Sequence, residues 1–282
     1  MKMSNSGTKA FLFAVPIAIL GGLIGLGGAE FRLPVLMRVF QYQAKRAVPI
    51  NLAISLVTVV SAAATRITTT TVEPVVALLP ILILFASASM MGAYIGTGYL
   101  HRLHDSHFER IVAALLILIG ALLIAESLFD FATHRVAEGM LANAILAIGF
   151  GLIIGVISSL LGVAGGELII PALILVFGLG VKEAGTASLL ISSATIVVGL
   201  FRYWKQGRYN DYREMTEMVV PMGIGSVIGS IAGAAMIGLV SAALLKALLG
   251  CILILSSLKI FSTASAPSPK SARTSGSAAS SR

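Results

Sequence analysis

Long stretches without a charged side chain are the feature of this chain that most restricts its fold. Six segments contain no Asp, Glu, Lys or Arg, and they cover residues 10–29, 47–65, 74–100, 139–166, 184–201 and 218–245. A membrane-spanning helix needs about 20 apolar residues. With 57% hydrophobic and 11% charged residues, the chain has more apolar surface than one soluble core can bury. The alternating pattern of membrane strands is absent. The sequence therefore predicts an all-α integral membrane protein.

The chain is a tandem duplication. Residues 21–34 read GGLIGLGGAEFRLP, and residues 158–171, at an offset of 137, read SSLLGVAGGELIIP. The same offset pairs Lys45 with Lys182, Ser55 with Ser192, Thr58 with Thr195, Gly92 with Gly229, and Gly96 with Gly233. We expect an N-terminus at 1–9, a first unit at 10–126, a connector and the start of the second unit at 127–146, a second unit at 147–261, and a disordered tail at 262–282. A mid-chain copy argues against a cleavable signal peptide at the first.

Each unit contains a glycine-interrupted segment followed by three uninterrupted spans. These spans are expected at 48–65, 75–100, 108–125, 184–203, 215–237 and 241–260. If the interrupted segment crosses the membrane, Lys and Arg divide 12 inside against 7 outside, with Arg32 set aside. If it turns back instead, 15 lie inside, and only Arg66, Arg135, Lys182 and Lys246 lie outside. The positive-inside rule favours the second topology.

Three true crossings per unit would make the second unit enter the membrane from the opposite side. Such an inverted repeat is typical of secondary transporters. We therefore expect two tandem four-segment repeats, inverted, each opening with a glycine-broken or re-entrant helix hairpin. Both termini are expected in the cytoplasm.

The repeated glycines predict a break in a helix at the same place in both units. They are Gly25, Gly27 and Gly28 in the first unit and Gly162, Gly165 and Gly166 in the second. Each glycine in a helix interior is about 1 kcal/mol less favourable than alanine. Irregular backbone at membrane depth is tolerated where it is buried in protein or lines a wet cavity, and a restarted helix attracts anions to its N-terminus. The alternative is close helix packing, as expected for the GxxxG pairs 92–96 and 229–233.

Two acids lie within the apolar segments, and their position at the membrane interior is costly. Glu30 and Glu167 occupy equivalent positions in the two units, and an acid at mid-bilayer costs about 2.5 to 3.5 kcal/mol. Each carboxylate either caps the helix that follows the break or carries a proton that couples to transport. The two roles are compatible.

Arg32 has no basic counterpart in the second unit, where Ile169 stands at the equivalent position. Its planar fork of donors is suited to an anionic substrate. Alternatively, it reaches the membrane interface or pairs with an acid across the bundle. Asn51 and its mate Ser188, with Ser192 and the other repeated hydroxyls, either line the cavity or bond to a neighbouring helix.

No enzyme, metal or cofactor is expected. The spacing of His101, His104 and His107 matches no tight zinc pattern, and Cys251 is the only cysteine. No histidine stands where a nucleophile could use it. The net charge of +8 is spread over connectors and termini, which argues against nucleic-acid binding. The expected partners are the lipid bilayer, a small anionic substrate and, as an open question, a second copy in a homodimer.

The duplicated glycine motif with its acid and proline resembles the TauE/SafE sulfite exporter family, also called the four-toluene-sulfonate uptake permease family. The resemblance covers the chain apart from its tail. It implies a bacterial inner-membrane carrier of small sulfur-containing anions such as sulfite, thiosulfate or organosulfonates. The positions that carry over are Gly25, Gly27, Gly28, Glu30 and Pro34, with Gly162, Gly165, Gly166, Glu167 and Pro171.

The sequence thus predicts a secondary transporter, an exporter of such anions, that works by alternating access around two facing broken helices. Three other functions stay open at this point. They are an anion channel, a carrier of another small organic acid, and a membrane subunit that transports nothing.

Overall fold

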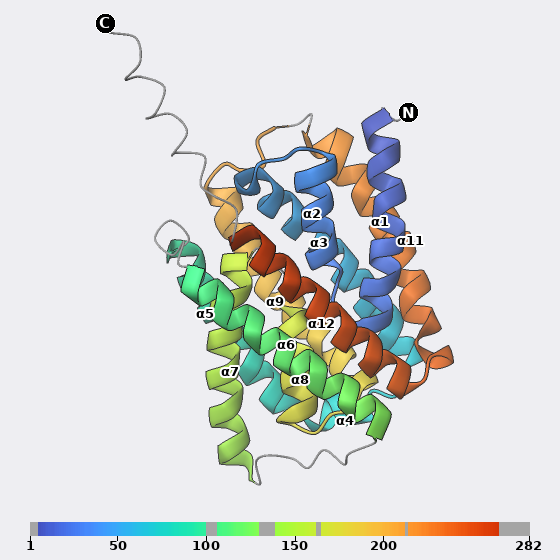
Figure 1. Ribbon diagram of the computed structural model, residues 1–282, viewed down its shortest axis with the longest axis vertical. Helices are drawn as coiled ribbons and strands as arrows, with labels where there is room; N and C mark the ends of the chain where they lie inside the picture. Colours follow the sequence, from blue (N-terminus) through green and yellow to red (C-terminus); the bar gives the residue numbers. More distant parts are fainter. Residues whose placement is uncertain (1–4, 100–105, 130–138, 162–164, 212–213, 265–282) are drawn as a thin grey trace, which may run out of the picture.

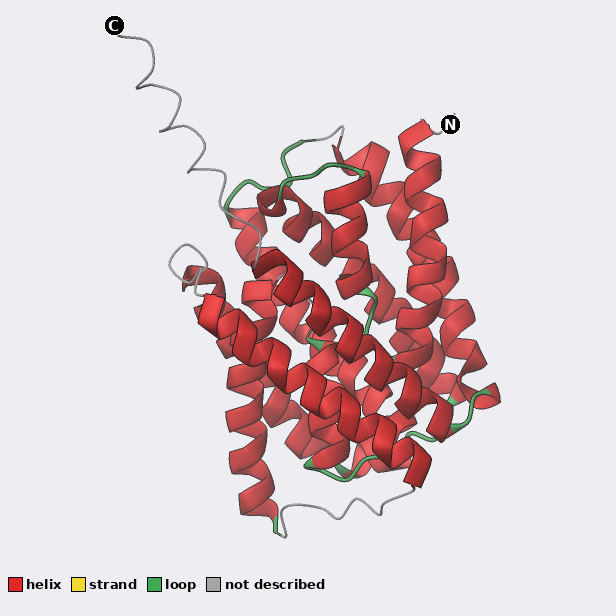
Figure 2. Ribbon diagram, viewed as in Figure 1, coloured by secondary structure: helices red, strands yellow, loops and turns green. Residues whose placement is uncertain are grey.

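The fold consists of helices joined by short connections. The structure is a computed structural model that describes residues 5–99, 106–129, 139–161, 165–211 and 214–264. No strand occurs in these ranges (Figure 2). Residues 130–138 of the connector expected at 127–146, and residues 265–282 of the tail expected at 262–282, lie outside them.

The first unit contains α1 (Asn5–Ile24), α2 (Ala29–Pro34), the π-helical turn η1 (Val35–Val39), α3 (Ala44–Thr69), α4 (Glu73–Ala77), α5 (Leu79–Tyr99) and α6 (Ser106–Phe129). The second contains α7 (Met140–Leu161), α8 (Gly166–Leu175), α9 (Val181–Lys205), η2 (Met215–Val219), α11 (Val220–Ala235), η3 (Met236–Leu239) and α12 (Ala242–Ala264). Corresponding elements follow in the same order, as expected of a duplication.

Six helices of the described chain are long and apolar enough to cross a membrane. They are α1, α3, α5, α7, α9 and the continuous run from η2 to η3. This set includes four of the six expected crossings, those of α3, α5, α9 and α11, and adds the first limbs α1 and α7. In α6 and α12, which are 24 and 23 residues long, the apolar stretches 116–125 and 242–257 lie within the described residues. Only the second limb of each interrupted segment, α2 or α8, is short.

The first interrupted segment folds into a hairpin. After the break, α2 and η1 return toward the end of the molecule at which α1 begins (Figure 1). Phe40, which follows η1, makes an edge-to-face contact with Phe13 in α1, with 6.5 Å between ring centroids. In Figure 1, α7 begins at the opposite end, and α8 returns toward that end.

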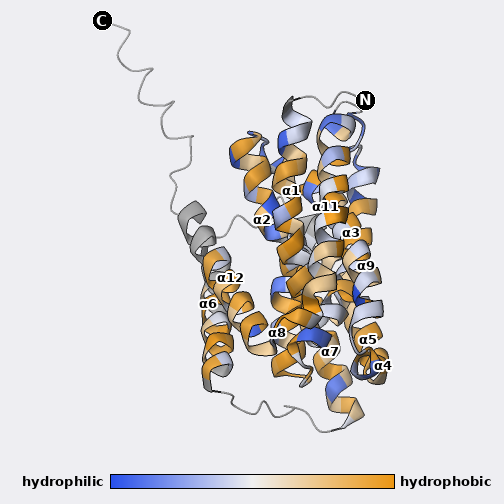
Figure 3. Cartoon of the chain, turned by 90° about the vertical axis from the view of Figure 1, so that its right-hand side faces the viewer, coloured by the Kyte–Doolittle hydropathy of each residue, from blue (hydrophilic) through white to orange (hydrophobic). Residues whose placement is uncertain are grey.

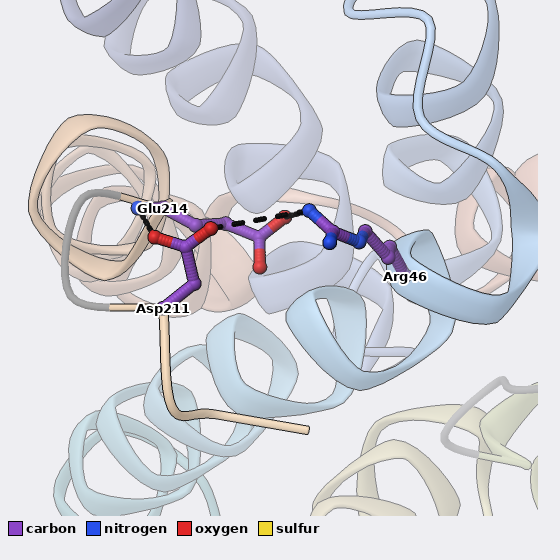
Figure 4. Close-up of polar contacts among 3 residues, drawn as sticks. All are labelled: Arg46, Asp211 and Glu214. Carbon is purple, nitrogen blue, oxygen red and sulfur yellow. Dashed lines mark hydrogen bonds and ion pairs between the residues drawn. The ribbon is translucent and has the colours of Figure 1, made fainter. Parts of the chain in front are cut away.

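Polar contacts between connections mark the two ends of the bundle. At one end, Arg46 in the first turn of α3 lies 3.9 Å from Asp211 and 4.0 Å from Glu214, which connect α9 to η2 (Figure 4). At the other end, Thr71 just after α3 donates to Glu183 in the first turn of α9. Helices α3 and α9 therefore run in opposite directions through the bundle.

The two units pack against each other reciprocally. Helix α5 of the first unit packs chiefly against α7, the first helix of the second unit. In the same way, α11 of the second unit packs chiefly against α1, the first helix of the first unit. A methyl group on Gly92 would collide with the Leu152 carbonyl oxygen, and one on Gly229 would collide with the Val15 carbonyl oxygen. Both contacts are related by the offset of 137 residues. Close packing is therefore confirmed for these GxxxG glycines.

Helices α6 and α12 pack against each other and form a layer on one side of the remaining helices (Figures 1 and 3). Their backbones cross at Gly120 and Gly250. Cys251 lies in α12 and is exposed. Apolar residues run along most of the helices in Figure 3, in keeping with a bundle embedded in lipid.

The backbone contact between α5 and α7 yields a stability prediction. We expect Gly155→Leu to lower the melting temperature (Tm) in detergent by roughly 5–10 °C, because overpacking costs about 1–3 kcal/mol or more and Gly155 lies against the Ser89 backbone. Gly149→Leu on the same helix is the matched control, since Gly149 has open space around it. Equal Tm values for the two variants would contradict the interpretation that α5 and α7 touch at this glycine.

The ion cluster at the end of the bundle yields a prediction about pH. Burial raises the pKa of the Glu214 carboxyl; Arg46 opposes the shift and Asp211 adds to it. The folded protein therefore holds this proton more tightly than the unfolded chain does, and stability falls as the pH rises through this range. We expect Glu214→Gln to raise Tm at neutral pH and to have no effect well below the ordinary value of 4.5. Thermal unfolding followed at both pH values checks this, and a lower Tm at neutral pH would refute it.

Candidate functional site

The two helix breaks have the same backbone geometry. Gly28 precedes α2 with φ 73°, and Gly165 precedes α8 with φ 81°. A left-handed conformation of this kind is strained for a residue with a Cβ, which explains why glycine stands at both equivalent positions. Gly25 and Gly27 also have positive φ values, whereas Gly162 lies outside the described residues. A helix break is therefore present in each unit.

The two breaks meet inside the bundle. A methyl group on Gly166 would lie 3.0 Å from the Cα of Leu26, so the start of α8 touches the first break directly. Gly25 packs against the backbone of Gly185 in α9. The sequence-based expectation of two facing breaks agrees with this arrangement.

Arg66 holds the end of α1, a role that the sequence analysis missed. It was expected outside the membrane as a connector charge, but its side chain is 0% exposed. Its Nε donates to the Gly22 carbonyl at 2.9 Å, and one terminal nitrogen donates to the Leu23 carbonyl. The other terminal nitrogen donates to the Lys182 carbonyl in α9 at 3.2 Å. The guanidinium thus satisfies carbonyls that the break leaves without helical partners.

Arg32 is also fully buried, at 0% exposure. Its guanidinium is therefore enclosed by the protein and is not exposed on the surface of the bundle. One terminal nitrogen donates to the Ser55 hydroxyl at 3.0 Å, and the other contacts the Thr58 hydroxyl at 3.0 Å, the Gly27 carbonyl at 3.3 Å and the Ser226 hydroxyl at 3.4 Å. All of these acceptors are uncharged. Glu30 interacts with Arg32 electrostatically, although their spacing of two residues did not suggest a pair.

The two acids have different surroundings. Both lie in the first turn of the helix after a break and are nearly buried, Glu30 at 6% and Glu167 at 5% exposure. Glu167 accepts a hydrogen bond from Ser256 in α12 at 2.9 Å, whereas Glu30 lies near the cation of its own unit. The N-cap residue of both helices is a glycine, Gly28 or Gly165, which has no side chain that could bond to the first turn.

The polar residues of α3 and α9 are not used alike. Asn51 donates to the Ala29 carbonyl at 2.9 Å and so fastens the start of α2 to α3. Its mate Ser188 and the nearby Ser192 are buried, and their hydroxyls have no hydrogen-bond partner among the described residues. The same holds for Ser158 in α7.

A pair of hydroxyls that occurs in both units is bonded differently in the unit that contains Arg32. In one unit-to-unit contact, Thr195 of α9 bonds to Ser89 of α5 at 3.0 Å. The mates of these residues are Thr58 and Ser226, and both accept from Arg32 instead. The guanidinium therefore lies between two hydroxyls whose counterparts in the other half bond directly to each other.

Sequence reasoning did not select Ser89, Ser226 or Ser158. The first two are related by the same offset of 137 residues, so the repeat itself would have shown them. Ser158 is equivalent to Gly21, and no repeat signal marks it. Ser158 also lines a small cavity of about 20 Å³, together with Thr195 and residues of α3 and α5.

This arrangement provides a positive site in an apolar bundle. A buried guanidinium with only neutral hydrogen-bond acceptors is costly, because a charge taken out of water needs a compensating partner. The start of α8 adds its positive dipole end nearby. Glu30 lowers this cost electrostatically, and a small anion that accepts hydrogen bonds from the guanidinium would lower it further.

The carbonyl contacts of Arg66 predict that it stabilises the fold. We expect Arg66→Met to lower Tm by on the order of 10 °C, since each carbonyl left unpaired costs about 1–3 kcal/mol. The Tm of Arg66→Lys should lie between those of Arg66→Met and the unaltered protein, because an ammonium group can donate hydrogen bonds but lacks the planar fork of a guanidinium. Lys45→Met, which alters an exposed cation of α3, serves as the control. If Arg66→Met melts like the unaltered protein, these carbonyls have other partners.

Comparison with known proteins is consistent with this geometry. A protein-family model described as Sulfite exporter TauE/SafE matches residues 2–123 and 146–281, one segment for each tandem repeat. No curated protein and no solved structure matches the chain. The family match extends over far more than half of the sequence. The chain is therefore a multi-pass membrane protein that belongs to the TauE/SafE sulfite exporter family.

Proposed function

We propose that this protein is a secondary transporter that exports small sulfur-containing anions such as sulfite, thiosulfate or organosulfonates. The observation that carries the proposal is the buried Arg32 guanidinium, whose hydrogen-bond acceptors are all uncharged. An anion with several oxygen atoms matches the parallel donors of a guanidinium. The sulfur chemistry comes from the family description.

Alternating access around the two breaks would carry the anion across the bilayer. The two units are proposed to have inverted topologies, which is supported by the opposite directions of α3 and α9 and by the reciprocal packing of α5 and α11. The bacterial inner membrane is the proposed location, with both termini in the cytoplasm. Substrate binding is assigned to the glycines of the breaks and to Glu30, Arg32, Asn51, Glu167, Ser188 and Ser192.

The membrane potential favours export over uptake. Moving an anion out of a negative interior is favoured by about 2.3 kcal/mol per charge per 100 mV. Export therefore needs no coupling ion, whereas uptake does. Glu30 and Glu167 are the candidates for carrying a proton where coupling occurs, because both carboxyl groups lie at the breaks and are nearly buried.

Counterflow in proteoliposomes tests this function. We expect saturable exchange of labelled sulfite or thiosulfate, and a rate roughly tenfold to a hundredfold lower in Arg32→Gln, because a charge-assisted hydrogen bond contributes about 1.5–3 kcal/mol. Glu30→Gln should change the pH dependence of the exchange. Arg38→Gln alters an exposed cation six residues further on and should exchange like the unaltered protein.

The outcome separates the classes of function. Currents that do not saturate and show no counterflow would identify a channel. Exchange of acetate but not of sulfur anions would identify a carrier of other organic acids. Folded protein that exchanges none of these anions would refute the proposal and favour a subunit without transport activity.

A further inference from the structure

We propose that the second unit contains a separate oxyanion site at the N-terminus of α8, built from the hydroxyls of Ser158, Ser188 and Ser192. The inference rests on the proposed function in that its ligand is the transported anion. It adds that one chain holds two anions at positions of unequal strength. Arg32 belongs to one of these positions, and the other has no cation.

Two serines of α9 behave differently from their neighbours. A serine or threonine inside a helix commonly bonds back to a carbonyl three or four residues earlier. Thr186, Ser193 and Thr195 all do so, at 2.7–3.0 Å. The hydroxyls of Ser188 and Ser192 are buried at 0% and 1% exposure and have no partner in the described part of the chain. They are donors available to a ligand.

The hydroxyls of Ser188 and Ser158 lie at a helix start, and Ser192 follows Ser188 by about one turn of α9. A methyl group on Gly166 would lie 3.3 Å from the Ser188 hydroxyl oxygen, and one on Gly165 would collide with the Ser158 hydroxyl oxygen. Helix α8 is ten residues long, and its N-cap residue is Gly165. The first amides of a helix have no partner within it and carry the positive end of the dipole, so they attract oxyanions.

The equivalent positions of the first unit are already occupied. Asn51, the mate of Ser188, bonds to the Ala29 carbonyl, and Ser55, the mate of Ser192, accepts from Arg32. Ile169 replaces Arg32 in the second unit, and a cavity of about 20 Å³ reaches Ser158 there. That volume holds about one water molecule. An anion is larger than one water molecule, so its binding at this position would widen the cavity.

The chemistry of the donors sets the strength of the site. Neutral hydroxyl and amide donors make hydrogen bonds about half as strong as those of a guanidinium. The second-unit site is therefore the weaker of the two and discriminates less by charge. Transport requires release of the anion as well as binding. A second site with weaker affinity would allow the anion to leave the protein after it has left the Arg32 site.

Equilibrium binding of labelled sulfite to the purified chain in nanodiscs tests the proposal. The unaltered protein should bind two anions per chain, with a second dissociation constant at least tenfold larger than the first. The double variant Ser188→Ala and Ser192→Ala should bind one. Its Tm without sulfite should be unchanged or higher, because removing an unpartnered buried hydroxyl costs no hydrogen bond.

Ser55→Ala is the matched control, since Ser55 is the repeat mate of Ser192 but bonds to Arg32. We expect its Tm to fall and its weaker site to remain. A double variant with a lowered Tm would mean that Ser188 and Ser192 are structural, and it would overturn the proposal. Two bound anions in the double variant would overturn it as well.

The stoichiometry of the unaltered protein distinguishes this inference from the proposed function. One bound anion together with counterflow would leave the transporter intact and overturn the second site, whose hydroxyls would then hold only water. No binding and no counterflow would refute the proposed function, and the second site with it.

Discussion

Backbone groups that lose their helical partners inside a membrane must find new ones, and the fold of this protein depends on that requirement. The chain interrupts a helix in each unit, and the exposed carbonyls of the first break are bonded by Arg66. Asn51 bonds to the carbonyl at the start of α2. Both residues belong to α3. This helix is therefore the support on which the first break is built, and its own path through the bundle positions α2 and Arg32.

Duplication produced two breaks, but their surroundings have diverged. The first unit fills the space beside its break with a guanidinium and an amide, and each is bonded to protein atoms. The second unit has serines at the equivalent places and an isoleucine where the guanidinium would lie. Similar backbone geometry at Gly28 and Gly165 thus supports two different chemical environments. A symmetric scaffold with an asymmetric interior is suited to a substrate that must be bound and then released.

Much of this arrangement could be predicted from the sequence, because it depends on local and periodic signals. Apolar length predicts the helices, self-comparison predicts the units, and the clustered glycines predict the breaks that lie at Gly25 to Gly28 and at Gly165. Arg66 could not be assigned, since it stands near the end of an apolar stretch like any flanking cation. Its partners at the break are carbonyl groups 43 and 44 residues earlier in the chain. They can accept from Arg66 only because the break leaves them without helical hydrogen bonds. Whether α1 is long enough to span the membrane was also open. The numbers of Lys and Arg on each side depend on the loops, and they do not show how deep a hairpin lies before it turns.

The contacts at Gly92 and Gly229 also determine which parts of the molecule can move together. At these glycines one backbone touches another, so no flexible side chain is present to absorb a relative displacement. Helix α1 must therefore travel with α11, and α7 with α5, although the members of each pair come from different copies of the ancestral gene. The rigid bodies of this protein are consequently not its two duplicated halves. Each is a hybrid of both, and the two hybrids meet where α3 packs against α9.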